Sequence, residues 1–237
     1  MHTDSDYISF RERIAAHKKA KEFNIYFVDK RGYFSCKRIF DLVISFIFIV
    51  AVLSWLTPII ALLILFSSRG PVFFLQRRVG TRGVAFTCYK FRTMVVNDDA
   101  DRLQASPYDT RITFIGNLLR RSNLDELPQF FNVLLGDMSI VGPRPHMYAD
   151  YHRFSSLIKE YEFRNLVRPG ITGIAQVKGF SGPATDIESI FGRYQWDAFY
   201  IRNAGFMLDL RIIRKTIAQQ LSFWVKPLYN FFFYKHD

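Results

Sequence analysis

The sequence predicts a mainly helical α+β fold, in which a membrane helix-break-helix is followed by one compact domain. The first observation is a run of 25 uncharged, largely apolar residues at 42–66, long enough to enter a bilayer at about 1.5 Å per residue. The second is that strand-like and helical patterns alternate from residue 67 onward, with no internal repeat and no long linker. The chain therefore combines a membrane segment with a globular domain.

The domain limits follow from these patterns. We predict four segments: a basic N-terminal tail (1–36), a re-entrant membrane hairpin (37–68), a globular domain (69–220) and an aromatic, basic tail (221–237). The last segment fits either an interfacial helix or an ordinary hydrophobic tail that docks on the domain.

The composition narrows the choice of partner. The 237 residues carry a formal net charge of +11 and include 25 Phe, and 49% of them are apolar. Cations together with aromatics are typical of a protein at an anionic membrane surface. A nucleic-acid partner would leave the apolar run unexplained, so none is predicted. Two cysteines make neither a disulfide framework nor a zinc site, and the polar N-terminus predicts no signal peptide.

Thr57-Pro58 interrupts the apolar run. Proline removes an amide donor and clashes with the preceding turn, so we predict that the helix breaks there. Lys and Arg flank both ends of the run, and such residues favour the cytoplasmic side. A re-entrant hairpin with both ends in the cytoplasm satisfies both flanks. A buried core helix is the alternative, although such helices are seldom apolar on every side over this length.

The globular domain begins with a predicted β-hairpin at 70–94 that turns at 80–83. The stretch "DELPQFFNVLLG" has apolar residues at helical spacing and ends at Gly136, which we expect to cap a helix. "VGPRP" and "RPGITG" are predicted as fixed loops, since neither suits a helix or a central strand. Residues 186–203 and 208–225 are predicted helices, the second amphipathic.

Two adjacent carboxylates, Asp125 and Glu126, stand before that predicted helix. With Pro128 in a first turn and Ser122 or Asn123 as a cap, acids here suit the helix dipole. The same acids would also suit a reaction site, because a carboxylate can attack phosphorus or hold a metal ion. The pattern alone fits both interpretations.

Cations surround the acid pair and favour the second interpretation. They are Lys90, Arg120, Arg121 and Arg144. Guanidinium groups suit phosphate, and metal with arginine is the usual way to neutralise a transferring phosphoryl group. Pro143 and Pro145 fix Arg144 in a loop, which lowers the entropy lost on binding. The alternatives for the arginines are ion pairs with the two acids or contacts with lipid headgroups.

Six motifs carry a resemblance to a known family. They are "KRIFDLVIS" (37–45), "GPVFFLQRRVG" (70–80), "YKFRTM" (89–94), "LRRSNLDELPQFFNVLLGDMSIVGPRP" (119–145), "VRPGITGIAQVKG" (167–179) and "LDLRIIRKT" (208–216). With them the chain resembles the bacterial sugar transferases, the monotopic polyprenyl-phosphate phosphoglycosyl transferases. The chain departs from the family pattern in three places. Ile174 stands where many relatives have Trp, Lys178 stands where Asn is common, and "NAGFMLDLRI" (203–212) lacks the two Trp that relatives often have there.

The resemblance implies an enzyme that transfers a sugar 1-phosphate from a UDP-sugar to undecaprenyl phosphate and releases UMP. It implies Asp125 as the nucleophile, Glu126 as its partner acid, and Mg²⁺ (or Mn²⁺) near both. Lys90, Arg120 and Arg144 match phosphate-contacting positions, with Arg121 less firmly placed, and Thr57-Pro58 matches the break in the membrane hairpin. The "GPRPHM" stretch favours UDP-glucose or UDP-galactose as the donor.

The resemblance also implies a bacterial inner-membrane protein with its catalytic domain on the cytoplasmic face. Inner-membrane lipids would surround it, downstream glycosyltransferases would use its product for surface polysaccharide, and homodimerisation stays open. Two rival hypotheses remain: direct transfer in a ternary complex, with Asp125 serving only the metal, and a non-catalytic basic membrane adaptor.

Overall fold

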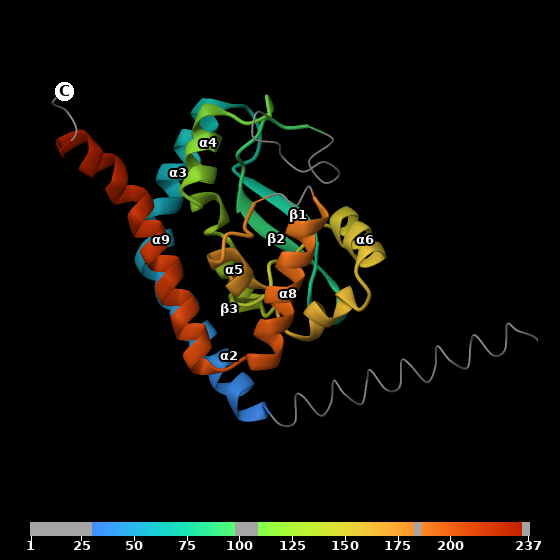
Figure 1. Cartoon of the computed structure of the whole chain (residues 1–237). Helices are drawn as coiled ribbons and strands as arrows, with labels where there is room; N and C mark the ends of the chain where they lie inside the picture. The colour runs from blue at the N-terminus through green and yellow to red at the C-terminus, as the bar shows by residue number, and fades with distance from the viewer. Residues whose placement is uncertain (1–29, 98–108, 183–185, 234–237) are drawn as a thin grey trace, which may run out of the picture. The chain divides into compact units, whose positions relative to one another are not determined.

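A computed structural model describes residues 30–97, 109–182 and 186–233, with side chains as far as residue 225. The predicted tails, 1–36 and 221–237, therefore lie partly outside the described residues. The chain forms two units, 1–40 and 41–237. All the elements that form the site belong to the second unit, and the mainly helical α+β class is confirmed (Figure 1).

The apolar run is helical from end to end. Helix α2 (Arg31–Phe48) leads through a π-helical turn, η1 (Ile49–Leu53), into α3 (Ser54–Ser67). The expected break of the helix at Thr57-Pro58 is wrong, because Pro58 lies inside α3 and the only irregularity, the π-helical turn η1 upstream of it, keeps helical backbone angles at both caps among the described residues. A wide turn just upstream gives the backbone room before a residue without an amide donor, and the Ser54 hydroxyl donates to the Val50 carbonyl at 2.6 Å there.

Helix α3 has one face against the domain and one face without a protein neighbour among the described residues. Ile60 and Ile64 are buried in a cluster with Phe91 of β2 and Leu119 of α4. Trp55, Leu62 and Phe66 are exposed. By length and composition, the helical stretch Arg31–Ser67 is able to cross a membrane.

Asp41 is a buried carboxylate in the same apolar stretch. Its oxygens accept hydrogen bonds from Ser139 Oγ at 2.7 Å and from the Ile140 amide at 3.2 Å. These bonds satisfy a charge that would otherwise be costly to bury, and they attach the second half of α2 to the domain.

The predicted β-hairpin is confirmed. Strands β1 (Phe73–Val79) and β2 (Ala85–Phe91) are antiparallel and joined by the short turn η2 (Thr81–Gly83). Side chains alternate between the faces of such a pair, so Cys88 is buried and Lys90, two residues later, points to the same face.

The acid pair lies in a short 3₁₀ turn of its own and not in the first turn of the α-helix that follows, contrary to one interpretation of the sequence. After α4 (Phe114–Arg121), Leu124–Glu126 form a separate 3₁₀ turn, η3, and neither Ser122 nor Asn123 caps it through a side chain. Helix α5 (Gln129–Leu135) begins after Pro128 and ends at Gly136, whose φ of 95° gives the predicted C-cap.

The two Gly-Pro loops contain a short parallel strand pair that the loop prediction missed. β3 (Ser139–Val141) pairs with β4 (Gly170–Thr172). A Cβ at Gly170 would overlap the Gly142 amide, so glycine is required for this approach. Between the strands lie α6 (Tyr148–Leu157) and η4 (Tyr161–Leu166), and α7 (Ile174–Val177) follows.

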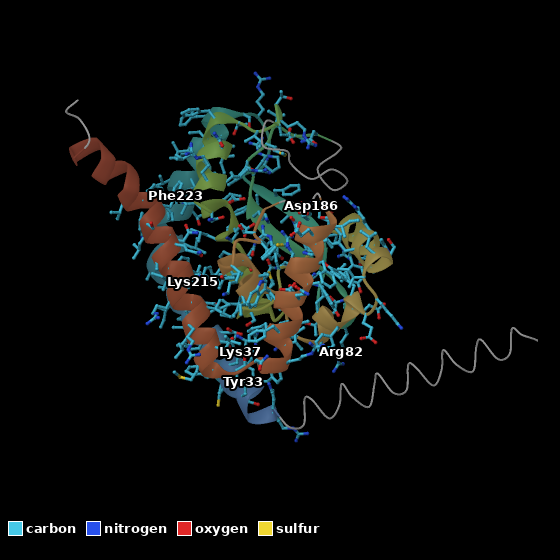
Figure 2. All side chains as sticks on the ribbon, in the orientation of Figure 1. Tyr33, Lys37, Arg82, Asp186, Lys215 and Phe223 are labelled. Atoms are coloured by element: carbon cyan, nitrogen blue, oxygen red, sulfur yellow. The ribbon has the colours of Figure 1, made fainter. Side chains whose placement is uncertain are left out.

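Two longer helices complete the domain, as predicted. α8 (Ile187–Asn203) starts at Asp186, which caps it by accepting from the Ser189 amide at 2.7 Å. α9 (Phe206–Phe233) packs against α7, β3 and β4. Figure 2 shows Asp186 at the start of α8, and Lys215 and Phe223 along α9. An exposed apolar stripe also follows α9: Met207, Leu210, Ile217, Leu221 and Trp224.

Candidate active site

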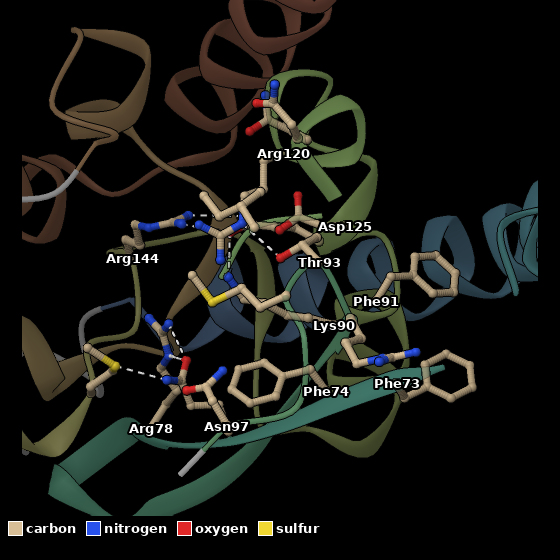
Figure 3. Close-up of a pocket in the computed structure, with 18 of the residues that line it drawn as sticks. Phe73, Phe74, Arg78, Lys90, Phe91, Thr93, Asn97, Arg120, Asp125 and Arg144 are labelled. Atoms are coloured by element: carbon tan, nitrogen blue, oxygen red, sulfur yellow. Dashed lines mark hydrogen bonds and ion pairs between the residues drawn. The ribbon is translucent and has the colours of Figure 1, made fainter. Parts of the chain in front are cut away.

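A cavity of about 560 Å³ opens beside the β-hairpin. Its walls come from β1 and β2, from α4 and η3, from the loop after β3, and from α8. Figure 3 shows Lys90, Arg120, Asp125 and Arg144 around it. Four of the predicted site residues, distant in sequence, therefore meet here, and Glu126 also lines the cavity.

Asp125 is a buried carboxylate with no hydrogen bond or ion pair to any residue that the structure describes; its exposed fraction is 8%. Burial, followed by the negative charge of Glu126, raises the pKa of the Asp125 carboxyl to about 6. Lys90, Arg120 and Arg144 oppose this rise. A carboxylate that lacks a partner and faces cations is available to an incoming group.

Glu126 has the opposite environment. Its Oε1 accepts from Lys90 Nζ and from Arg144 Nη2, both at 2.6 Å, and Oε2 accepts from Arg144 Nη1 at 3.0 Å. Burial raises the pKa of Glu126, but the charges and hydrogen bonds of Arg144 and Lys90 outweigh burial and hold the pKa well below its usual range. Glu126 thus remains ionised and orients two cations at the cavity wall.

The two arginines at the end of α4 differ in position. Arg120 lines the cavity, and its Nε donates to Thr93 Oγ1 at 2.8 Å. Arg121 is exposed and does not line the cavity, so the structure does not bring it into the cluster. Adjacent helical residues point about 100° apart, which explains why only one of them reaches the site.

The loop that carries Arg144 is held by more than its prolines. Pro143 and Pro145 are buried, as the fixed loop requires. In addition, Arg78 Nη1 donates to the Pro145 carbonyl and Arg164 Nη2 to the Arg144 carbonyl, both at 2.6 Å. Sequence reasoning missed these two arginines, although "QRR" in the strand motif was a signal for Arg78.

Thr57 and Pro58 do not line the cavity, but α3 contacts residues next to the acid pair. Leu124 and Leu127, which flank the acid pair, pack against the cluster that contains Ile60 and Ile64 of α3. The position of the 3₁₀ turn is therefore coupled to the apolar helix.

The part of the chain that the structure describes holds no group of three or more His, Cys, Asp or Glu side chains able to form a metal site. Mg²⁺ does not need such a cage, because it is commonly bound by one or two carboxylates together with substrate phosphates. Asp125 fits that role, since its oxygens have no partner within 30–97, 109–182 and 186–233, the residues described. Both oxygens of Glu126 are already ion-paired.

Comparison with known proteins decides the family. The model of the bacterial sugar transferases matches residues 32–222, which include the whole cavity. The chain belongs to this family. The resemblance predicted from the six motifs is thereby confirmed.

Three relatives illustrate the family. A UDP-glucose:undecaprenyl-phosphate glucose-1-phosphate transferase of Xanthomonas campestris pv. campestris is 46% identical, over 82% of this chain and 41% of that protein. A UDP-N-acetylgalactosamine-undecaprenyl-phosphate N-acetylgalactosaminephosphotransferase of Aeromonas hydrophila is 44% identical, over 68% of this chain and 38% of its own. The exopolysaccharide production protein PSS of Rhizobium leguminosarum bv. phaseoli is 42% identical, over 78% of this chain and 95% of its own.

Proposed function

We propose that this protein transfers a sugar 1-phosphate from a UDP-sugar to undecaprenyl phosphate, with Asp125 as the nucleophile. One observation carries the proposal: Asp125 is buried and without a partner among the described residues, in a cavity walled by Lys90, Arg120 and Arg144. The names of the Xanthomonas and Aeromonas relatives support the reaction class.

In the first step, a carboxylate oxygen of Asp125 attacks the β-phosphorus of the UDP-sugar. The bond from this phosphorus to the oxygen that bridges the two phosphates breaks, and UMP leaves with the bonding electron pair. The sugar phosphate is then held on Asp125 as an acyl phosphate. Arg144 and Lys90, fixed by Glu126, with Arg120, offset the charge on the phosphate oxygens.

In the second step, an oxygen of undecaprenyl phosphate attacks the same phosphorus. The acyl phosphate bond breaks, the Asp125 carboxylate is regenerated, and the lipid leaves as a sugar diphosphate. The covalent intermediate lets two anionic substrates use one cavity in turn. No water is consumed, so a buried site that excludes water favours transfer over hydrolysis.

The apolar surfaces support a site at the membrane. The exposed side of α3 and the apolar stripe of α9 would lie in or on the inner membrane, with the domain on the cytoplasmic side. We keep the re-entrant arrangement, in which both ends of the hairpin lie in the cytoplasm, as part of this proposal. Such a placement lets the lipid phosphate approach at headgroup depth while the nucleotide sugar arrives from water.

Mg²⁺ (or Mn²⁺) is part of the proposal. Asp125 would hold it together with the substrate phosphates, where the ion would neutralise phosphate charge. Glu126 would serve by positioning Arg144 and Lys90 and by keeping the charge balance of the site. Binding of UDP to the Asp125→Asn variant, measured by calorimetry with and without Mg²⁺, tests the assignment. A metal that strengthens UDP binding equally in wild type and variant would contradict Asp125 as a ligand.

UDP-glucose is the donor that we propose first, in line with the Xanthomonas relative; the Aeromonas relative makes UDP-N-acetylgalactosamine the first competitor to assay. The test is UMP release from a panel of UDP-sugars in the presence of undecaprenyl phosphate and Mg²⁺. Asp125→Asn should abolish UMP release and the labelled adduct. Wild-type turnover by that variant would overturn the nucleophile assignment.

Initial-rate kinetics separate this route from direct transfer in a ternary complex. Parallel double-reciprocal lines are expected for the covalent route, and intersecting lines for the ternary one. A chain that binds undecaprenyl phosphate but releases no UMP from any donor would instead favour the adaptor hypothesis.

A further inference from the structure

His146 lines the cavity, in the loop that follows Pro145. Its ring is 3% exposed and lies edge-on to Phe154, with the centroids 5.2 Å apart. Nδ1 and the Tyr161 hydroxyl share a hydrogen bond of 2.7 Å. The ring orientation is therefore fixed, yet Nε2 is buried and has no hydrogen-bond partner among the residues that the structure describes.

Arg193 of α8 lines the same cavity and also carries an unpaired buried nitrogen. Its side chain is 6% exposed, and Nη2 donates to the Gly182 carbonyl at 2.5 Å. The Nε–H is buried without a partner in the described part of the chain. Arg92 Nε, from another residue that lines the cavity, is also buried without a partner among the described residues, but the other N–H groups of Arg92 donate to the Ser68 and Arg69 carbonyls. His146 and Arg193 therefore give two further orphaned polar nitrogens in the wall of one cavity, on separate elements.

Buried polar groups nearly always have a partner, so two such groups beside one cavity call for an explanation. A ligand that enters the cavity would supply it. Burial, followed by the charge of Arg164, holds the pKa of His146 well below its usual range, so the imidazole is neutral. A neutral imidazole nitrogen beside one guanidinium N–H suits an uncharged group with a hydroxyl or a carbonyl better than a phosphate.

We propose that His146 Nε2 and Arg193 Nε bind the uncharged part of the nucleotide sugar, as specificity-determining residues that sequence reasoning did not single out. The inference rests on the proposed function. The hexose offers hydroxyl groups and the uracil ring offers carbonyl groups, so two parts of the donor could meet these nitrogens. Arg144, only two residues before His146, would hold the phosphates between this subsite and Asp125.

Matched variants test the role of His146. An Asn side chain places its amide near the position of Nδ1, so His146→Asn retains a partner for Tyr161 and removes the Nε2 group. A Gln side chain reaches the position of Nε2, so His146→Gln retains a polar group at that position and removes the partner of Tyr161. Arg193→Lys removes the Nε–H and keeps the charge, and Arg202→Lys, an exposed position on the same helix, is its control.

The measurement is binding of UDP-glucose and of UDP to the full-length chain in detergent, with the melting temperature recorded for each variant. We expect His146→Asn and Arg193→Lys to bind UDP-glucose about tenfold more weakly, and His146→Gln and Arg202→Lys to bind it nearly as wild type does. If UDP binding is unchanged in the first pair, the subsite holds the hexose; if UDP binding weakens equally, it holds uracil.

Wild-type affinity in both His146→Asn and Arg193→Lys would overturn the proposal. So would a loss confined to His146→Gln, because that result would assign His146 to the Tyr161 contact alone. If His146→Asn does not fold, the Arg193→Lys comparison decides. UMP release by the wild type separates the two proposals. If the wild type turns over and the variants bind UDP-glucose with wild-type affinity, only the subsite is refuted. If the wild type binds UDP-glucose but releases no UMP, only the proposed reaction is refuted. A wild type that binds no UDP-glucose refutes both.

Discussion

Asp125 and Glu126 are adjacent in sequence and opposite in environment. Glu126 is paired with Lys90 and Arg144, and Asp125 has no partner among the described residues. Lys90, Arg120 and Arg144 all act on Asp125 through space. Two of them, Lys90 and Arg144, also form hydrogen bonds with Glu126. This asymmetry supports the proposal that Asp125 is the reactive acid and that Glu126 positions the cations.

The buried Asp125 carboxylate is expected to reduce the stability of the fold. Its pKa of about 6 lies above the ordinary value of 3.8, so the folded state holds the proton more tightly than the unfolded state does. The protonated carboxyl contributes its full stabilisation of the folded state below about pH 3.8. This contribution is lost as the pH rises through about 6. Asp125→Asn should therefore stabilise the chain at pH 7.5 by roughly 1–3 kcal/mol.

Thermal melts in EDTA, without nucleotide, measure this effect. The gain should shrink as pH is lowered from 7.5 toward 4. A variant that melts at the wild-type temperature across this range would show that the carboxylate is not strained by burial.

Glu126→Gln is expected to shift the acidic limb of the pH–rate profile for UMP release, the first half-reaction. Below about pH 6 the Asp125 carboxyl holds its proton and cannot attack, so UMP release should fall as pH is lowered through that value. The negative charge of Glu126 raises the Asp125 pKa, so removing that charge should move the limb to lower pH. Single-turnover UMP release from UDP-glucose without lipid reports the limb, whatever the rate at the plateau. An unmoved limb would contradict the coupling.

At the scale of elements, the loop between β3 and α6 depends on arginines from distant parts of the chain. Arg164, from η4, binds the Arg144 carbonyl and forms a buried ion pair with Asp197 of α8 at 2.8 Å. Arg78, from β1, holds the next carbonyl. The prolines limit the backbone angles of the loop, and the arginines fix where the loop lies.

Arg164→Met is expected to destabilise the domain by about 3–5 kcal/mol, because it leaves the buried Asp197 carboxylate without its partner. The double variant Arg164→Met/Asp197→Leu removes the unpaired charge and should recover most of the stability. Its UMP release should stay reduced, since the Arg164 donor to the Arg144 carbonyl is gone. Chemical denaturation and turnover, measured on the same samples, separate the two effects; full activity in the double variant would refute the positioning role.

At the scale of the whole molecule, elements with local signals were predictable and contacts between distant segments were not. The hairpin around Gly80–Gly83 and the cap at Gly136 follow from turn and capping chemistry. The parallel β3–β4 pair was missed, because it joins two short segments about 30 residues apart and depends on a close approach at Gly142 and Gly170.

The same division holds for the site. The acids and three of the cations were identified because they gather in recognisable motifs. Arg78, Arg164 and Arg193 were not, since each acts through a contact that only the fold creates. The helical break was placed at Thr57-Pro58 because proline is a local signal, whereas the tolerance of α3 for Pro58 and the π-turn upstream are not readable from the sequence.

The proposed membrane topology predicts that both ends of the apolar run are labelled from the same side. Cys36 is an exposed thiol and Cys88 is fully buried, so the wild-type chain already carries one probe. Val84→Cys in a Cys36→Ser background provides the other, because Val84 is 66% exposed in the hairpin turn. In inverted and right-side-out vesicles, a membrane-impermeant maleimide should reach both positions only from the cytoplasmic side. Labelling from opposite sides would establish a straight span.

With α3 in the membrane and Asp125 as the nucleophile, as proposed, the packing of Leu124 and Leu127 against α3 would give the lipid environment a direct influence on the chemistry. Because the acid pair lies between these two leucines, the depth at which α3 sits also sets the height of Asp125 above the acyl chains. A change in bilayer thickness shifts or tilts an inserted helix. Reconstitution in lipids of increasing chain length should therefore give an optimum in turnover, at the thickness where the lipid phosphate and the Asp125 carboxylate come level.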